Sequence, residues 1–71
     1  MHEQVKDPSH YNSGDVACIT ALRSALGVEG FRGFCSGNII KYVWRHKRKG
    51  NAVADLEKAQ QYLTWLIDDI A

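Results

Sequence analysis

The chain has 71 residues, of which 45% are hydrophobic and 24% are charged, with a formal net charge of +1. A chain of this length is expected to form one small domain, because it buries only about 60% of the surface that it exposes when unfolded. Neither a GxGxxG nor a GxxxxGK[ST] string occurs, which excludes the Rossmann and P-loop designs for nucleotide binding. Since so small a core stabilises a monomer only marginally, we expect a homo-oligomer.

No apolar run approaches the roughly 20 residues that span a bilayer, and the first residues lack the pattern of a signal peptide. We therefore expect a soluble, cytoplasmic protein without a membrane partner. The two cysteines, Cys18 and Cys35, have neither CxxC spacing nor the density of a disulfide scaffold. We expect both to be reduced and mostly buried.

The chain begins with an expected irregular arm, residues 1–14, because Pro8 and its polar neighbours favour turns. Helical spacing of apolar residues predicts a first helix over 15–26, with Ser13 or Asp15 as its cap and Gly27 as its stop.

A second helix is predicted over 31–48, where apolar residues recur at helical spacing from Phe31 onward. Gly33 and Gly37 disfavour this helix by up to about 1 kcal/mol each. They could permit close backbone packing, or the helix could begin later, near Ser36.

Residues 49–51 form an expected turn, with Gly50 ending one helix and Asn51 capping the next. The third helix, 52–70, carries an apolar seam at alternating spacings of three and four, and a second row that widens it: Val53, Leu56, Gln60, Leu63, Ile67 and Ile70, then Ala59, Tyr62 and Leu66. The predicted fold is all-α, a three-helix domain in which the second and third helices form an antiparallel hairpin.

Charge is distributed unevenly along the chain. Residues 23–50 contain seven basic residues against one acidic residue, a sum of +6, whereas residues 1–22 sum to −2 and residues 51–71 to −3. The basic segment could attract an anion, or it could attract the neighbouring acidic helices. The sequence leaves both interpretations open.

Three cations of the basic segment, Lys41, Arg45 and Arg48, lie at i, i+4 and i+7 and so share one helix face. They could form a solvated face that Asp55 and Glu57 neutralise across the hairpin. Alternatively, they could clamp a phosphate, with Arg45 supplying a bidentate fork and Lys41 a point charge.

Further polar and aromatic residues have a structural and a functional interpretation each. Asn38 and His46 interrupt a buried stripe, so their hydrogen bonds must be satisfied inside the fold or at a ligand. His10 and Tyr11 could fold over the hairpin as an acid–base group and a stacking ring. Trp44 and Trp65 suit a core or an interface better than a nucleobase. The histidines lack metal-ligand spacing, so no transition metal is expected.

Three ordered motifs cover most of the chain: PxHY from Pro8, FxxFxxGNxxKYxWR from Phe31 and DLxKAxxYL from Asp55. This pattern resembles a small phage and prophage family of unknown function, commonly described as phage nucleotide kinases after the nucleotide kinase of T7-like phages. The resemblance implies a phage-encoded protein that binds or phosphorylates deoxynucleoside monophosphates in the infected cell. We assign candidate catalytic roles to Asp55, His10 and His46, and candidate ligand-binding roles to Tyr11, Asn38, Lys41, Trp44, Arg45, Lys58 and Tyr62.

The chain departs from the family pattern in its first predicted helix. That helix usually reads GxxExID, whereas Ala17 and Thr20 stand here at the acidic positions. A kinase needs charge compensation, usually by Mg²⁺ ions that carboxylates hold, so Mg²⁺ would be the cofactor of such a reaction. The alternatives are a non-catalytic binder, which sequesters a nucleotide signal or inhibits a host defence protein, and a nucleic-acid-binding module that uses residues 45–49.

Overall fold

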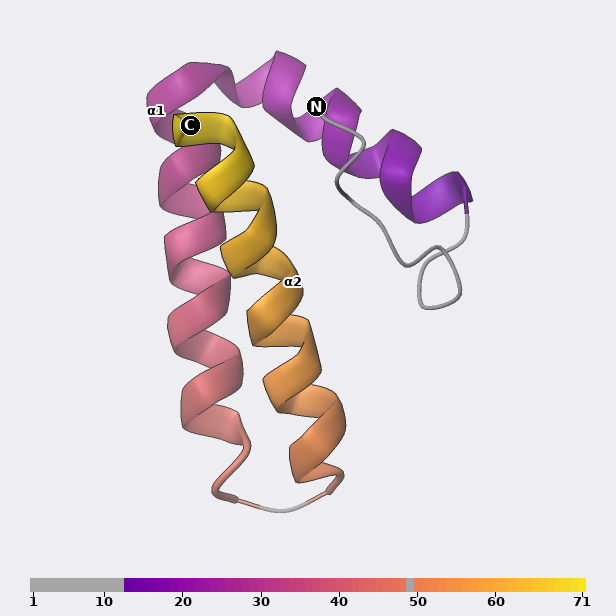
Figure 1. Cartoon of the computed structure of the whole chain (residues 1–71), viewed down its shortest axis with the longest axis vertical. Coiled ribbons are helices and arrows are strands. Elements are labelled where there is room, and N and C mark those ends of the chain that lie inside the picture. The colour runs from indigo at the N-terminus through magenta and orange to yellow at the C-terminus, as the bar shows by residue number, and fades with distance from the viewer. Residues whose placement is uncertain (1–12, 49) are drawn as a thin grey trace.

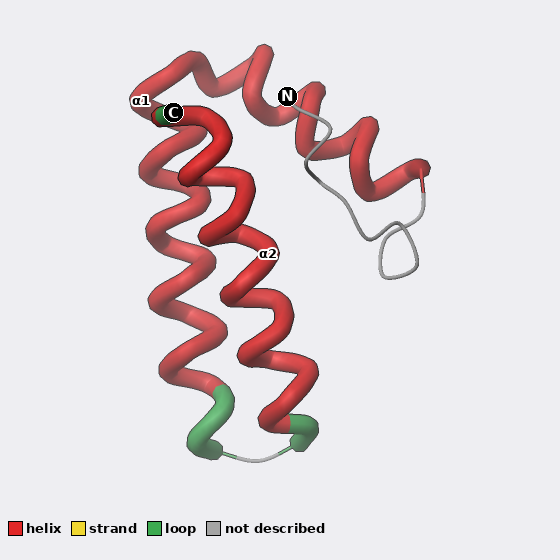
Figure 2. Tube along the Cα trace, in the orientation of Figure 1, coloured by secondary structure: helices red, strands yellow, loops and turns green. Residues whose placement is uncertain are grey.

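The computed structural model describes residues 13–48 and 50–71, and this part of the chain is all-α, with no strand. Helix α1 spans Ser13–Arg45 and helix α2 spans Ala52–Ile70. The later part of α1 runs antiparallel to α2, and the earlier part of α1 crosses the end of this hairpin near the C-terminus (Figure 1). A short connection joins the two helices at the opposite end (Figure 2). The expected arm, residues 1–14, lies almost wholly outside the described residues.

The prediction of three helices is wrong, because the first two are parts of the single helix α1. Only Gly27 departs from helical backbone angles, with φ 77° and ψ 179°. This region of backbone space is open essentially to glycine alone, so Gly27 bends the chain sharply at one residue and the helix resumes at once. Gly27 therefore bends the helix instead of ending it as expected. Helix α1 also ends earlier than expected, at Arg45, and residues 46–48 form a turn.

The predicted limits of the last helix are confirmed, because α2 spans Ala52–Ile70. Asn51 caps it as expected, since the side-chain oxygen of Asn51 accepts a hydrogen bond of 3.0 Å from the backbone nitrogen of Ala54. Gly50 adopts φ 88°, in the left-handed region that favours glycine, but it lies five residues after Arg45 and so does not end a helix as expected.

The core is small and lies where the two helices meet. Its buried apolar members are Ile19, Phe31, Cys35, Ala59 and Trp65, and Leu22, Phe34, Tyr62 and Leu66 pack against them. The side of α2 that packs on α1 is therefore the second apolar row, whereas the large apolar residues of the predicted seam are exposed. Among the cysteines, Cys35 is buried as expected and Cys18 is exposed, contrary to expectation; both are free thiols.

Both alternatives that the sequence allowed for Gly33 and Gly37 are wrong. The helix is continuous through both positions, so it does not begin near Ser36. Within the described residues, a Cβ at either glycine would meet no atom within 4 Å, so neither glycine permits a close contact between α1 and α2.

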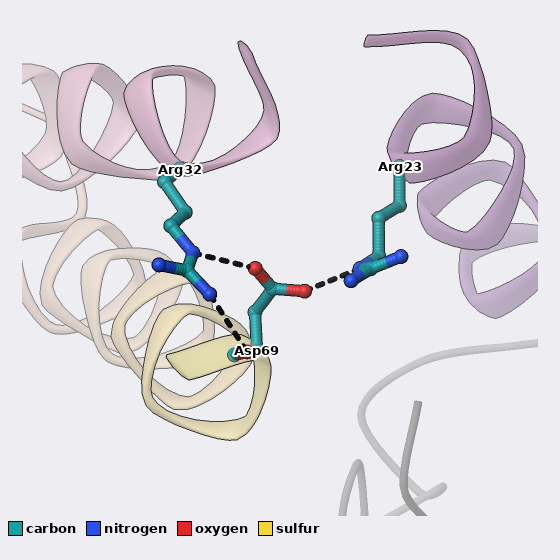
Figure 3. A network of polar contacts seen from close by, with 3 residues as sticks. All are labelled: Arg23, Arg32 and Asp69. Atoms are coloured by element: carbon teal, nitrogen blue, oxygen red, sulfur yellow. Dashed lines mark hydrogen bonds and ion pairs between the residues drawn. The ribbon is translucent and has the colours of Figure 1, made fainter. Parts of the chain in front are cut away.

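An ionic clamp fixes the bent part of α1 against the end of α2 (Figure 3). The Asp69 carboxylate receives a hydrogen bond from Arg23, which precedes the bend, and one of 2.8 Å from the Nε of Arg32, which follows it. A further hydrogen bond of 3.1 Å joins the Arg32 guanidinium to the backbone oxygen of Asp69. These guanidinium contacts, those of Arg32 foremost, hold the pKa of Asp69 below its ordinary value despite burial.

Neither α1 nor α2 combines the length and the apolar character that a membrane-crossing helix requires.

Candidate functional site

Three cations surround one aromatic ring near the turn between the helices. The Nζ of Lys41 lies 4.5 Å from the centre of the Tyr42 ring, the Cζ of Arg45 lies 5.4 Å from it, and the Nζ of Lys58 lies 5.5 Å from it. Lys58 comes from α2, whereas the other residues come from α1. Tyr42 is itself held by stacking on Tyr62, with ring centres 6.0 Å apart and an angle of 13° between the planes. We call Lys41, Arg45 and Lys58 the cation cluster.

Among the described residues, the cation cluster has one ion pair with an acidic side chain across the hairpin. The Nε of Arg45 lies 3.3 Å from a carboxylate oxygen of Asp55, in the first turn of α2. Asp55 is only 4% exposed, while just over half of the Arg45 side chain remains accessible. This pair agrees with one of the two interpretations that the sequence left open, in which acidic residues of the next helix neutralise the cations across the hairpin. One carboxylate against three cations leaves the cluster with a positive charge that can attract an anion.

An apolar groove lies on one side of the cluster. It has a volume of about 260 Å³, and we call it the aromatic groove; it is lined by Cys18, Ile19, Leu22, Tyr42, Lys58, Gln61, Tyr62 and Trp65. The edge-to-face contact of Tyr62 with Trp65, at 5.4 Å between ring centres, fixes the aromatic wall. The Nε2 of Gln61 is buried and has no hydrogen-bond partner among the described residues. The groove therefore combines flat apolar walls with a few polar groups, as small-molecule sites do.

A second, wider groove lies on the outer side of α1. It has a volume of about 600 Å³, and we call it the basic groove; it is lined by Ile40, Lys41, Trp44, Arg45, Arg48 and Gly50. Lys41, Arg45 and Arg48 all line this groove, but only Lys41 and Arg45 share the predicted helix face, because Arg48 lies in the turn that follows α1. Trp44 is 68% exposed and offers an open ring face beside the cations, whereas Trp65 is a core residue, as the sequence suggested.

The remaining predicted site residues lie elsewhere. Asn38 donates a hydrogen bond of 2.9 Å to the backbone oxygen of Phe34, one turn earlier in the same helix, which satisfies part of its amide locally. The Nδ1 of His46 contacts the backbone oxygen of Val43, so this ring closes the end of α1. His10 and Tyr11 lie outside the described residues. Of the predicted site residues within the described part of the chain, the structure thus brings these to the cation cluster or its two grooves: Lys41, Trp44, Arg45, Asp55, Lys58 and Tyr62.

The donor atoms around the cluster do not fit a Mg²⁺ ion held by the protein. Among residues 13–48 and 50–71, no three His, Cys, Asp or Glu side chains gather in one place. Asp55 is the buried carboxylate at the site, and it is already paired with Arg45. A Mg²⁺ ion that accompanied a nucleotide would therefore be held by the phosphates rather than by a carboxylate cage in this part of the chain.

Comparison with known proteins places the chain in a family. Residues 5–64 match the family described as protein of unknown function (DUF3310). The chain belongs to the DUF3310 family. Its relatives include the gene 1.7 protein of Enterobacteria phage T3, which is 40% identical over 66 residues, and the nucleotide kinase gp1.7 of Escherichia phage T7, which is 39% identical over 64 residues.

The family resemblance inferred from the sequence motifs is thereby confirmed. The two alignments cover 87% and 84% of this DUF3310 chain, but only 40% of the T3 protein and 33% of the T7 protein. The chain thus spans about two fifths and one third of the length of these relatives. No solved structure matches it.

Sequence reasoning missed two residues of this DUF3310 site. Tyr42 enters the sequence-based predictions only within a motif. Its position directly after Lys41 and three residues before Arg45 is the signal that could have indicated an aromatic ring among cations. Gln61 carries no signal in the sequence, because it is one of two adjacent glutamines on an amphipathic helix. Its burial beside the aromatic groove depends on how α1 bends at Gly27.

Proposed function

We propose that this protein binds two nucleotides whose phosphates meet at the cation cluster, and that it transfers a phosphoryl group between them. A deoxynucleoside monophosphate occupies the aromatic groove, with its phosphate toward Lys58 and Arg45. A nucleoside triphosphate occupies the basic groove, where Lys41, Arg45 and Arg48 oppose its larger charge. The observation that carries this proposal is the position of Lys41 and Arg45, which line the basic groove and also lie against Tyr42, a wall of the aromatic groove.

The chemistry of the cluster suits phosphoryl transfer. In that reaction an oxygen of the monophosphate attacks the γ-phosphorus of the triphosphate, and a nucleoside diphosphate leaves. Catalysis depends mainly on positioning and on compensating the charge of the transferred group. Arg45 can contact phosphate oxygens with its planar fork, and Lys41 and Lys58 supply point charges. The name of the T7 relative, a nucleotide kinase, supports the same reaction class.

A non-catalytic nucleotide binder is the second candidate, and two observations favour it. Ala17 and Thr20 replace the acids of the family pattern. The one buried carboxylate near the cations, Asp55, is engaged by Arg45 and is not free to orient an attacking group. Such a protein would sequester a nucleotide without turnover.

Matched substitutions test the assignment of the two grooves. Arg45→Lys keeps the charge but removes the fork, and should weaken binding of both nucleotides by about 1 kcal/mol, or roughly fivefold. Lys58→Ala should weaken only the monophosphate, and Arg48→Ala only the triphosphate. Lys47→Ala is the control, since Lys47 is an exposed cation of the turn that lines neither groove. Calorimetric titration with each nucleotide, with and without Mg²⁺, measures these differences.

Turnover distinguishes the two candidates. The kinase requires that a mixture of the two nucleotides yields two diphosphates, detected by chromatography. If the protein binds a monophosphate tightly but transfers no phosphoryl group from any triphosphate, the kinase proposal is wrong and the sequestering function replaces it. Equal losses from Arg45→Lys and Lys47→Ala, together with a steep salt dependence, would instead indicate diffuse electrostatics of the kind used with nucleic acid.

Thiol labelling gives an independent readout of the aromatic groove. Cys18 is exposed and lines the groove, while Cys35 is fully buried. Burial, with a smaller contribution from the Asp69 charge, raises the pKa of the Cys35 thiol to about 11, so Cys35 stays protonated at neutral pH. A bound monophosphate should slow modification of Cys18. Equal protection by the triphosphate alone would contradict the division of the two nucleotides between the grooves.

A further inference from the structure

Helix α2 has an apolar face that is largely exposed in the described part of the chain. Its residues alternate at spacings of three and four, the heptad pattern of a helix that packs on another helix: Val53, Leu56, Gln60, Leu63, Ile67 and Ile70. The five large apolar residues among them are between 41% and 65% exposed. We call these six positions the α2 seam.

The exposure of the α2 seam is unusual for so small a protein. The described chain buries five apolar residues, whereas ten large ones are exposed, and half of those ten lie on this one face of α2. Single exposed apolar residues are normal, but a contiguous stripe of them marks an interaction surface. The other face of α2, which includes Ala59 and Trp65, already packs on α1, so the seam is free to accept a further helix.

We propose that the α2 seam is the interface through which two copies of this chain associate, with their α2 helices antiparallel about a two-fold axis. The seam is complementary to itself in this arrangement. Val53 lies opposite Ile70 of the partner subunit, Leu56 opposite Ile67 of the partner subunit, and Gln60 opposite Leu63 of the partner subunit. Every pair is equally distant from the point between Gln61 and Tyr62, which an isologous contact requires.

The polar residues in and beside the seam are compatible with this contact. Gln60 is the one polar member, and it lies next to the axis, so the two Gln60 amides come into adjacent layers and can hydrogen-bond to each other. The heptad positions that flank the seam carry a single formal charge, on Glu57; the others are Ala52, Ala59, Thr64, Leu66 and Ala71. No row of like charges therefore opposes the approach of a second copy.

Charge at the turn selects the antiparallel orientation over the parallel one. Arg45, Lys47 and Arg48 lie at the end of the hairpin where α2 begins. Parallel helices would bring the two basic turns together. Antiparallel helices separate them by about the length of α2, roughly 28 Å for its 19 residues. That separation exceeds the Debye length of about 8 Å at physiological ionic strength, so the repulsion is screened.

The mass of the full chain in solution tests the interface. Light scattering at micromolar concentration should give a particle of twice the 8.0 kDa chain mass. Leu63→Glu places a charge in the central layer and should weaken association by about 100-fold or more, while circular dichroism reports whether the helices persist. Ile40→Glu is the control, because Ile40 is an apolar residue that is even more exposed than Leu63 but lies on α1. It should leave the dimer intact.

A monomeric wild-type chain would overturn the proposal. The proposal would also fail if Ile40→Glu dissociated the dimer while Leu63→Glu had no effect, because that result would place the contact on α1. Gln60→Leu keeps the test decisive if Leu63→Glu unfolds, because an apolar residue at this layer should tighten the dimer. Weaker association of Gln60→Leu would also contradict the interface.

Cross-linking tests the orientation. In a Cys18→Ser background, a mixture of Val53→Cys and Ile70→Cys chains should form a disulfide-linked dimer on oxidation, whereas Val53→Cys alone should not. The reverse result would show parallel helices and overturn the antiparallel arrangement. These measurements need no nucleotide, so their outcome is separate from that of the proposed function.

Discussion

Asp55 and Arg45 form an unequal pair, because the carboxylate is buried while the guanidinium remains accessible to solvent. The buried partner loses most from separation, since an unpaired carboxylate in a low-dielectric environment is unfavourable by several kcal/mol. Arg45 can still turn some of its N–H groups toward a ligand, because one carboxylate does not use all five donors of a guanidinium. Asp55 is therefore suited to positioning Arg45 for a phosphate rather than to reacting with one.

Asp55→Asn tests this role. The change preserves shape and removes the charge, so it should lower the free energy of unfolding by about 1 kcal/mol, a value discounted for the exposure of Arg45. Turnover for each folded molecule should hold within severalfold, and phosphate affinity should rise slightly as Arg45 gains freedom. Thermal denaturation and titration with a monophosphate measure the two effects. A fall in turnover of several orders of magnitude at unchanged affinity would make Asp55 a catalytic residue instead.

At the scale of elements, Gly27 determines the shape of α1. Its backbone angles bend the chain so that the residues before it, including Cys18 and Leu22, form one wall of the aromatic groove. A straight helix of the same length would carry those residues away from α2. Gly33 lies in the same helix in ordinary helical conformation, with open space around it.

The two glycines should respond oppositely to alanine. Gly27→Ala forces a side chain into a conformation that is strained by about 1–3 kcal/mol, so it should destabilise the fold or straighten α1 and open the aromatic groove. Gly33→Ala should stabilise the fold by about 0.5–1 kcal/mol, because alanine favours a helix and nothing obstructs its Cβ. Chemical denaturation compares the two variants. Equal effects would contradict the bend at Gly27.

At the scale of the whole molecule, Asp69 connects the end of α2 to two points of α1 that are distant from it in sequence. It lies at the end of α2 and binds Arg23 before the bend of α1 and Arg32 after it (Figure 3). The contact between the two parts of α1 thus depends on a carboxylate that belongs to neither. The core alone is small, so this clamp supports the position of the earlier part of α1, and with it the aromatic groove.

The clamp predicts a loss of stability in acid. Since the pKa of Asp69 is lowered in the folded state, its contribution is fully present above the ordinary value of 3.8 and is lost as pH falls through the lowered folded pKa. Asp69→Asn should remove this part of the pH dependence and lower stability at neutral pH by about 1–2 kcal/mol, discounted for the partial exposure of both arginines. Urea denaturation from pH 2 to 7 measures the difference. An unchanged acid profile in Asp69→Asn would contradict the clamp.

The features that could be predicted from the sequence depend on interactions between residues that are close together in the chain. Helical periodicity and the Asn51 cap fixed the limits of α2, because hydrogen bonding and side-chain spacing act within a few residues. The ordered motifs identified the family, and the helix repeat placed Lys41 and Arg45 on one face of α1, whereas Arg48 lies in the turn after it.

Tertiary structure decided which of two apolar faces of α2 would be buried. The sequence predicted a seam that the second row widens, without indicating which part packs on α1, and in the structure the side with Ala59 and Trp65 is the buried one. In the same way, periodicity located a break at Gly27 but could not distinguish a loop from a one-residue bend, because the direction after a break depends on long-range contacts such as Asp69 with Arg23 and Arg32. The cation cluster around Tyr42 likewise forms only when α2 brings Lys58 to α1. Helical periodicity could not predict this cluster, because it relates residues within one helix and does not indicate which other helix they pack against.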